Sequence, residues 1–70
     1  MINERQALGQ ALLYALDKIG GTVRMAEAAG VSPQAVSQWR HIPIHHVVTI
    51  SKRTGLPRHR LRPDLYEARG

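Results

Sequence analysis

Three polar residues, Gln34, Ser37 and Gln38, have types and spacing suited to reading the edges of DNA bases. Intervals of three and four residues place them on one face of a helix. A glutamine amide can accept from adenine N6 and donate to adenine N7 at once, and a serine hydroxyl can pair with several bases. The pattern predicts a base-reading face, with ordinary surface polarity as the alternative.

Four further residues could contact the phosphates beside such a face: Thr22, Arg24, Ser32 and Arg40. Contacts of this kind fix the register of a protein on a duplex without reading its sequence. The overall charge favours a polyanionic partner, because 10 Lys and Arg stand against 5 Asp and Glu and give a formal charge of +5. Nucleic acid is the first candidate, and an anionic membrane surface the second.

Metal binding and catalysis find little support in the sequence. The chain has 4 His and no Cys. His41 and His45 are four residues apart, but Ile42 and Pro43 break the helical face that a pair of metal ligands would need. The acidic residues are scattered, and the chain has neither a Ser-His-acid set nor a glycine loop that could cradle phosphates. We therefore expect no metal, no cofactor and no enzymatic activity.

The elements that would position these residues have a helical period. Asn3 and Gln6 have the capping-box spacing. An apolar stripe at intervals of three and four follows, and Gly20-Gly21 ends that helix. The stripe consists of Leu8, Ala11, Leu12, Ala15, Leu16 and Ile19. We predict a long first helix whose apolar stripe faces the core.

Two short helices are predicted next. Thr22 caps one over residues 23–29, and Ser32 with Pro33 starts another over residues 33–40. Helices joined by a turn of about three residues form the helix-turn-helix, whose second helix enters the major groove. Small Ala26 would lie where the helices cross, Gly30 and Val31 in the turn, and Val36 and Trp39 against the core. The base-reading and phosphate-contacting residues would all lie on or beside this unit.

Pro43 interrupts the pattern before a fourth helix over residues 44–54. Its expected inward residues are Ile44, Val47, Ile50 and Ser51 or Thr54. A short turn over residues 56–61 follows, the run 58–62 looks like a charged surface around one Leu, and residues 64–70 are expected to form an extended tail. We predict an all-α fold, a single small bundle of four to five short helices forming one domain over residues 1–70.

The stretch from Gly20 to Tyr66 resembles a known family. The resemblance is carried by GGTVRMAEAAGVSPQAVSQW and TGLPRHRLRPDLY, which are similar to the Cro-type phage repressors and the related YdaS-like bacterial antitoxin and regulator proteins. It implies a lambda-repressor-like DNA-binding domain that represses transcription, commonly as a dimer on a pseudo-palindromic operator. The sequence departs from the family pattern at residues 40–43 after the Trp, and at His45 and His46, near which an acidic residue is often found.

We therefore expect a sequence-specific repressor of Cro type that binds a double-stranded DNA operator as a homodimer, with helix 33–40 in the major groove. The alternative is an antitoxin-like interaction module that binds a toxin partner through Leu61, Leu65 and Tyr66, residues that could instead cover the core or form a two-fold interface. A third alternative is nonspecific nucleic-acid binding by charge alone. Apolar runs fall far short of the roughly 20 residues that span a bilayer, and the N-terminus has no signal-peptide pattern, so we expect a cytoplasmic location and no membrane partner.

Overall fold

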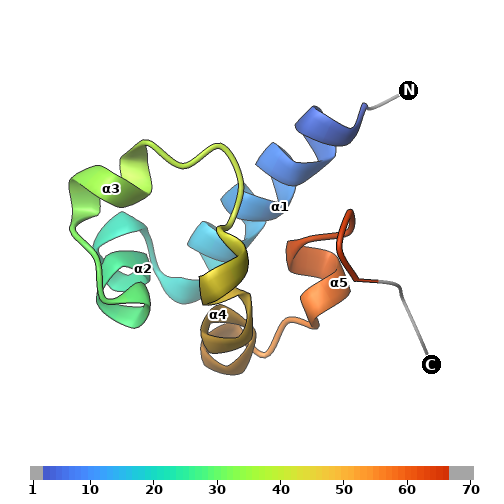
Figure 1. Cartoon of the computed structure of the whole chain (residues 1–70). Helices are drawn as coiled ribbons and strands as arrows, with labels where there is room; N and C mark the ends of the chain where they lie inside the picture. The colour runs from blue at the N-terminus through green and yellow to red at the C-terminus, as the bar shows by residue number, and fades with distance from the viewer. Residues whose placement is uncertain (1–2, 67–70) are drawn as a thin grey trace.

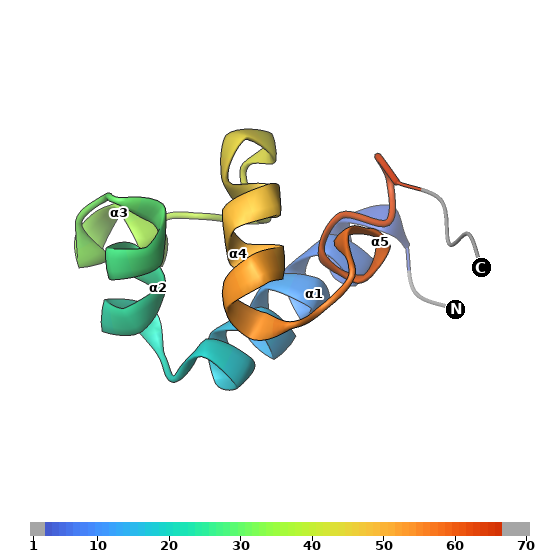
Figure 2. The ribbon, with the colours of Figure 1, turned by 90° about the horizontal axis from the view of Figure 1, so that it is seen from below.

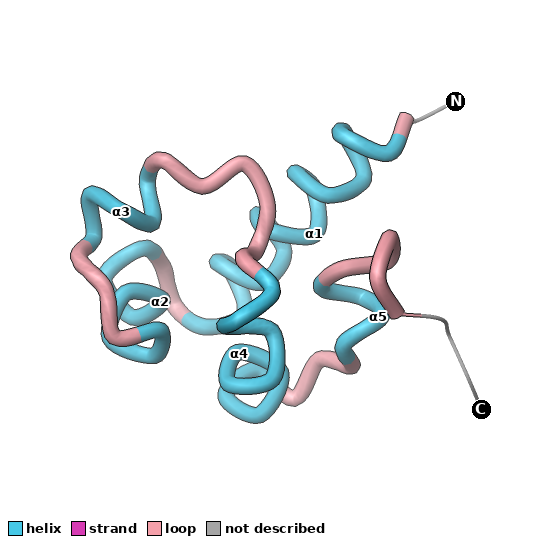
Figure 3. Tube along the Cα trace, in the orientation of Figure 1, coloured by secondary structure: helices cyan, strands magenta, loops and turns pink. Residues whose placement is uncertain are grey.

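The described part of the chain folds into six helical elements, and Figure 1 shows their arrangement. The computed structural model describes residues 3–66, and within them the order is α1 (Glu4–Ile19), α2 (Thr22–Ala29), α3 (Pro33–Ser37), the 3-10 turn η1 (Ile44–His46), α4 (Val47–Thr54) and α5 (Arg58–Leu61). No strand occurs among residues 3–66, which confirms the predicted all-α bundle. Figure 3 shows that the longest loop runs from α3 to η1. Within the same residues, no helix combines the length and the apolar character needed to cross a membrane.

Helix α1 begins with the predicted capping box. The Gln6 N–H donates to Asn3 Oδ1 at 2.8 Å, and the Asn3 N–H donates to Gln6 Oε1 at 3.2 Å. The helix ends at Gly20, whose φ of 103° lies in the left-handed region that glycine tolerates best. Its apolar stripe faces inward as expected, with Leu12 and Ala15 buried and the other members half-buried.

Helix α4 stands between two helix pairs. It packs against α2 and α1, and also against α5, while α2 packs against α3. Figure 2 shows this arrangement from below, with α2 and α3 on one side of α4 and α1 and α5 on the other. The largest fully buried side chains come from four parts of the chain: Met25, Ile42, Val47, Ile50 and Leu61. The core therefore joins the helix-turn-helix to the C-terminal helices.

Helix α3 is shorter than predicted. It ends at Ser37 and not at Arg40, because the N–H of Gln38 bonds to Ala35 O at 3.1 Å and that of Trp39 to Val36 O at 3.0 Å, closing the last turn tightly. The chain then leaves the helical path and carries Ile42 into the core, where it is fully buried. A continuing helix would not bring Ile42, which precedes a proline, to that place.

Two smaller expectations about helix starts are also wrong. The N-cap of α2 is Gly21, which has no side chain to cap with, and Thr22 is already the first helical residue. Ile44 does not face inward but is 52% exposed, since Ile42 is the residue that enters the core at this point of the chain. Val47 and Ile50 are buried as predicted.

The chain folds back after α5. Residues 63–65 form a turn in which the N–H groups of Leu65 and Tyr66 donate to Arg62 O at 3.0 and 3.1 Å. Tyr66 is half-buried and packs against the core. This turn replaces the extended conformation expected for Asp64 to Tyr66, and the remaining residues of the expected tail, 67–70, lie outside the described residues.

Candidate nucleic-acid interface

The outer face of α3 carries the three residues predicted to read bases. Ser32 caps the helix by accepting from the Ala35 N–H at 3.2 Å, and Pro33 occupies the first turn. Gln34 and Ser37 are exposed on the helix, and Gln38 is exposed at its C-cap. The structure therefore brings these three side chains together within one short exposed segment.

The inner face of α3 is held firmly. Gly30 takes a φ of 71° in the turn, and the Val31 N–H donates to Ala26 O at 3.0 Å. Ala26 and Val36 are both buried where α2 and α3 pack together. Trp39 is half-buried against the core. This is a helix-turn-helix with a fixed inner face and a free polar outer face, as the sequence predicts.

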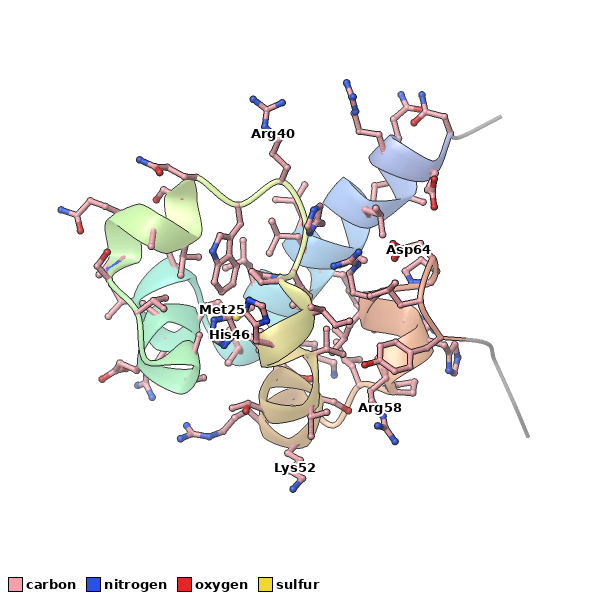
Figure 4. All side chains as sticks on the ribbon, viewed as in Figure 1. Met25, Arg40, His46, Lys52, Arg58 and Asp64 are labelled. Carbon is pink, nitrogen blue, oxygen red and sulfur yellow. The ribbon has the colours of Figure 1, made fainter. Side chains whose placement is uncertain are left out.

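Arg40 lies in the connection that follows α3. It is exposed, and Figure 4 shows its side chain pointing into solvent. Arg40 and Arg5 both line a cleft of about 300 Å³, together with Glu4, Leu8 and His41. Figure 1 shows α3, this connection and the first turn of α1 along one edge of the molecule. Arg5 and Arg40, which are distant in the sequence, therefore line one cleft, together with the acidic Glu4.

Arg5 is a cation of this cleft that the sequence did not predict as a phosphate contact. It lies 35 positions before Arg40 in the chain. A cation in the first turn of α1, where Arg5 is exposed, was the one sign of such a role. That Arg5 shares a cleft with Arg40 follows only from the packing of α1 against the connection.

The other predicted phosphate contacts do not line this cleft. Arg24 lines a separate depression of about 440 Å³ with Lys18, Ile19, Glu27 and Arg53. Thr22 is half-buried in the first turn of α2, and the Ser32 hydroxyl is occupied by the Ala35 N–H. Each of these contacts stays a prediction. The structure groups Arg40 with Arg5 and separates both from Arg24.

Lys52 lies far from Arg40. Figure 4 shows the two side chains pointing away from opposite ends of the molecule. Lys52 belongs to the last turn of α4, where its charge meets the negative end of the helix dipole.

Arg62 differs most from its expected surroundings. The sequence places it in a charged surface run, but it is only 8% exposed. Its Nε donates to Asp64 Oδ1 at 2.9 Å and its Nη2 to Asp64 Oδ2 at 2.7 Å. These bonds raise the pKa of Arg62 further above its usual range and lower the pKa of Asp64. This is the one ion pair among residues 3–66.

Arg62 also reaches across the fold. Its Nη1 donates to the Ile42 carbonyl at 2.8 Å and lies 3.3 Å from His41 Nδ1. The C-terminal turn is thereby tied to the connection that carries Arg40. Sequence reasoning gave no sign of this link, because its partners are 20 and 21 residues apart.

The histidines next to α4 take part in packing. The rings of His46 and Trp39 are stacked, and the ring of His45 meets that of His46 edge-on, with centroids 5.9 Å apart. In the part of the chain that the structure describes, no three His, Asp or Glu side chains gather as a metal site would require.

One family model matches the chain, and it covers both the helix-turn-helix and the C-terminal turn. The model is described as bacterial toxin YdaS and matches residues 12–69. Comparisons with curated proteins and with solved structures gave no match. The chain belongs to the YdaS family. The YdaS part of the predicted resemblance is confirmed, and the Cro-type part stays a prediction.

Proposed function

We propose that this member of the YdaS family binds double-stranded DNA sequence-specifically and represses transcription, with α3 in the major groove. One observation carries the proposal: Gln34, Ser37 and Gln38 are exposed on the outer side of a helix whose inner side is fixed by buried Val36 and by Trp39. A short capped helix that presents amides and a hydroxyl to solvent suits the base edges of a major groove.

Affinity would come mostly from phosphate contacts. Arg40 and Arg5 line one cleft, and they belong to the connection after α3 and to the first turn of α1, which share an edge of the molecule with α3 (Figure 1). There they would hold the sugar-phosphate backbone beside the groove. Thr22, Arg24 and Ser32 are further predicted contacts. The formal charge of +5 favours approach to DNA and makes binding depend on salt.

Specific binding would require two copies of the chain. Helix α3 has 5 residues, so it is about 7.5 Å long and follows only about two base pairs. A homodimer on a pseudo-palindromic operator doubles the bases read, with recognition helices about 34 Å apart. This argument from helix length supports the dimer expected from the sequence.

Salt-dependent duplex binding tests this proposal. A labelled duplex pool of random sequence is titrated with the protein between about 50 and 200 mM salt. The proposal predicts binding whose log affinity falls linearly with log salt, and stronger binding to duplex than to single strands of the same sequences. A folded protein that binds neither form at low salt would contradict the proposal.

A second candidate function is an antitoxin-like interaction module. Leu65 is 45% exposed on the C-terminal turn, whereas Leu61 is fully buried and Tyr66 packs against the core. Of the three apolar residues suggested for a toxin partner, Leu65 is therefore the most available.

Leu65→Ser separates the two candidates better than truncation. Removing the residues after Arg62 would also remove Asp64 and the partly buried ion pair, and this would destabilise the fold. If Leu65→Ser abolishes partner binding and leaves duplex binding unchanged, the second candidate is supported. If dimerisation and duplex affinity fall together, Leu65 belongs to a homodimer interface of the repressor.

A further inference from the structure

The connection between α3 and η1 has no regular structure of its own. It runs through residues 38–43 and carries Arg40. Its geometry must therefore be set by the points at which it is anchored. On one side of Arg40, Trp39 packs against the core, and on the other side Ile42 is fully buried.

Arg62 supplies the polar anchor of this connection. Its Nη1 donates to the carbonyl of Ile42 at 2.8 Å, two residues after Arg40. Without Arg62 this buried carbonyl would keep only His41 Nδ1 as a neighbour, at the longer distance of 3.4 Å, and buried polar groups are costly when unpaired. The other side of the guanidinium is held by Asp64, whose Oδ1 accepts from Arg62 Nε at 2.9 Å and whose Oδ2 accepts from Nη2 at 2.7 Å. The two bonds to Asp64 thus fix the orientation of the Arg62 guanidinium, which in turn bonds to the connection through Nη1.

Only arginine can make this set of contacts. Its planar fork donates from Nε and Nη2 to one carboxylate while Nη1 donates elsewhere. A lysine keeps the charge but has a single ammonium group, which cannot satisfy Asp64 in this bidentate way and also reach Ile42 with the same geometry. Arg62→Lys therefore removes the anchor without changing the net charge.

We propose that Arg62 is a positioning residue for DNA binding: it fixes the connection after α3 and so holds Arg40 at the phosphate backbone. This inference rests on the proposed DNA binding. Arg62 itself is buried and touches no DNA. The C-terminal turn and the connection then act as one unit, so that a substitution at Asp64 changes the position of Arg40.

A double-mutant cycle between Arg62 and Arg40 tests the proposal. Duplex affinity and its salt slope are measured for the wild type, Arg62→Lys, Arg40→Ala and the double variant, with thermal unfolding to check the fold. We expect Arg40→Ala to lower affinity about fivefold to tenfold near 0.1 M salt and the slope by about one. Arg62→Lys should produce much of the same loss in the wild type and almost none in the Arg40→Ala background.

Asp64→Asn provides a second variant in case Arg62→Lys does not fold. It retains the guanidinium and its bond to Ile42 but weakens the support behind it, so a smaller loss with the same dependence on Arg40 is expected. Arg58→Ala is the control for a change in an arginine of the C-terminal part that does not hold the connection. Arg58 is exposed on α5, and its guanidinium lies over the Tyr66 ring at 5.6 Å.

The possible results separate two claims: that the protein binds DNA, and that Arg62 positions Arg40. If Arg62→Lys lowers duplex affinity equally in the wild-type and Arg40→Ala backgrounds, the positioning role is overturned while DNA binding stands. The same holds if Arg62→Lys leaves the salt slope of the wild type unchanged. Absence of salt-dependent duplex binding by the wild type would overturn both. Loss of affinity that requires Arg40 would support the positioning role, since general destabilisation would lower affinity whether or not Arg40 is present.

Discussion

The rings of Trp39 and His46 are stacked, with centroids 5.6 Å apart and planes inclined by 21°. This contact links the start of the connection after α3 to the residue that precedes α4, because Trp39 comes just before Arg40 and His46 just before Val47. The chain just after α3 is therefore held by ring packing against the residue that precedes α4. Arg62 holds the other end of the same connection through Ile42.

His46→Ala should destabilise the fold by about 0.5–1.5 kcal/mol, the usual contribution of an aromatic pair beyond its buried area. For a domain of this size, each kcal/mol lowers Tm by about 4–8 °C. Thermal unfolding followed by circular dichroism measures the change. His46→Phe keeps a stacking ring and should retain most of the stability. If both variants unfold at the wild-type temperature, the stack contributes nothing to the fold.

Gln34→Ala should weaken binding to the cognate duplex by about 1–3 kcal/mol and change binding to random duplex little, because a bidentate base contact is lost. Gln38→Ala should behave in the same way. Gln10→Ala is a matched control, since Gln10 is exposed on α1 and lies outside the helix-turn-helix. Competition titrations with both duplexes give the two affinities. Equal losses on cognate and random DNA would remove Gln34 from the base-reading face.

Arg5→Ala and Arg40→Ala should each weaken binding to all duplexes alike and lower the salt slope by about one, because each removes a phosphate contact. Lys52→Ala removes the same charge at the opposite end of the molecule (Figure 4) and should leave the slope nearly unchanged. Anisotropy titrations over a range of salt concentrations measure the slope. A slope changed as much by Lys52→Ala as by Arg5→Ala would mean that general charge, and not the cleft, determines affinity.

Asp64→Asn should destabilise the protein at neutral pH by about 1.5–3 kcal/mol, the range for hydrogen bonds to charged groups. The hydrogen bond from Arg62 lowers the pKa of Asp64, so the ionised carboxylate stabilises the folded state above its unfolded pKa of about 3.9. That stability is lost as pH falls through the lower folded pKa. The difference between wild type and variant should therefore be constant near neutrality and shrink below about pH 4.

Denaturant unfolding at several pH values measures this difference. Asp17→Asn, a change at an exposed carboxylate of α1, is the control for loss of charge. A gap between wild type and Asp64→Asn that stays the same through acid pH would show that the carboxylate charge does not stabilise the fold.

Local signals predicted most of the helix-turn-helix. Ser32, Pro33 and Gly30 act on their immediate neighbours, so their types alone located the start of α3 and the turn before it. The capping box of α1 was predictable for the same reason. The helical period also placed Val36 against the core and left Gln34 on the outside.

Contacts between distant residues could not be predicted. Helical periodicity continues through Trp39, and nothing local shows that burial of Ile42 draws the chain away after Ser37. Arg62 looks like a surface charge until its partners 20 residues earlier are known. Arg5 gains a role only from the cleft that it shares with Arg40. The sequence therefore predicts the start and the inner face of α3, and the fold reveals what positions the connection after it.

Selection of bound duplexes from a random DNA pool, at about physiological salt, tests the central claim most directly, because nonspecific contacts are weakened there. We expect enrichment of a pseudo-palindrome with half-sites about one helical turn apart, and loss of that enrichment in a Gln34→Ala, Gln38→Ala double variant. A folded wild-type protein that enriches no sequence would contradict it.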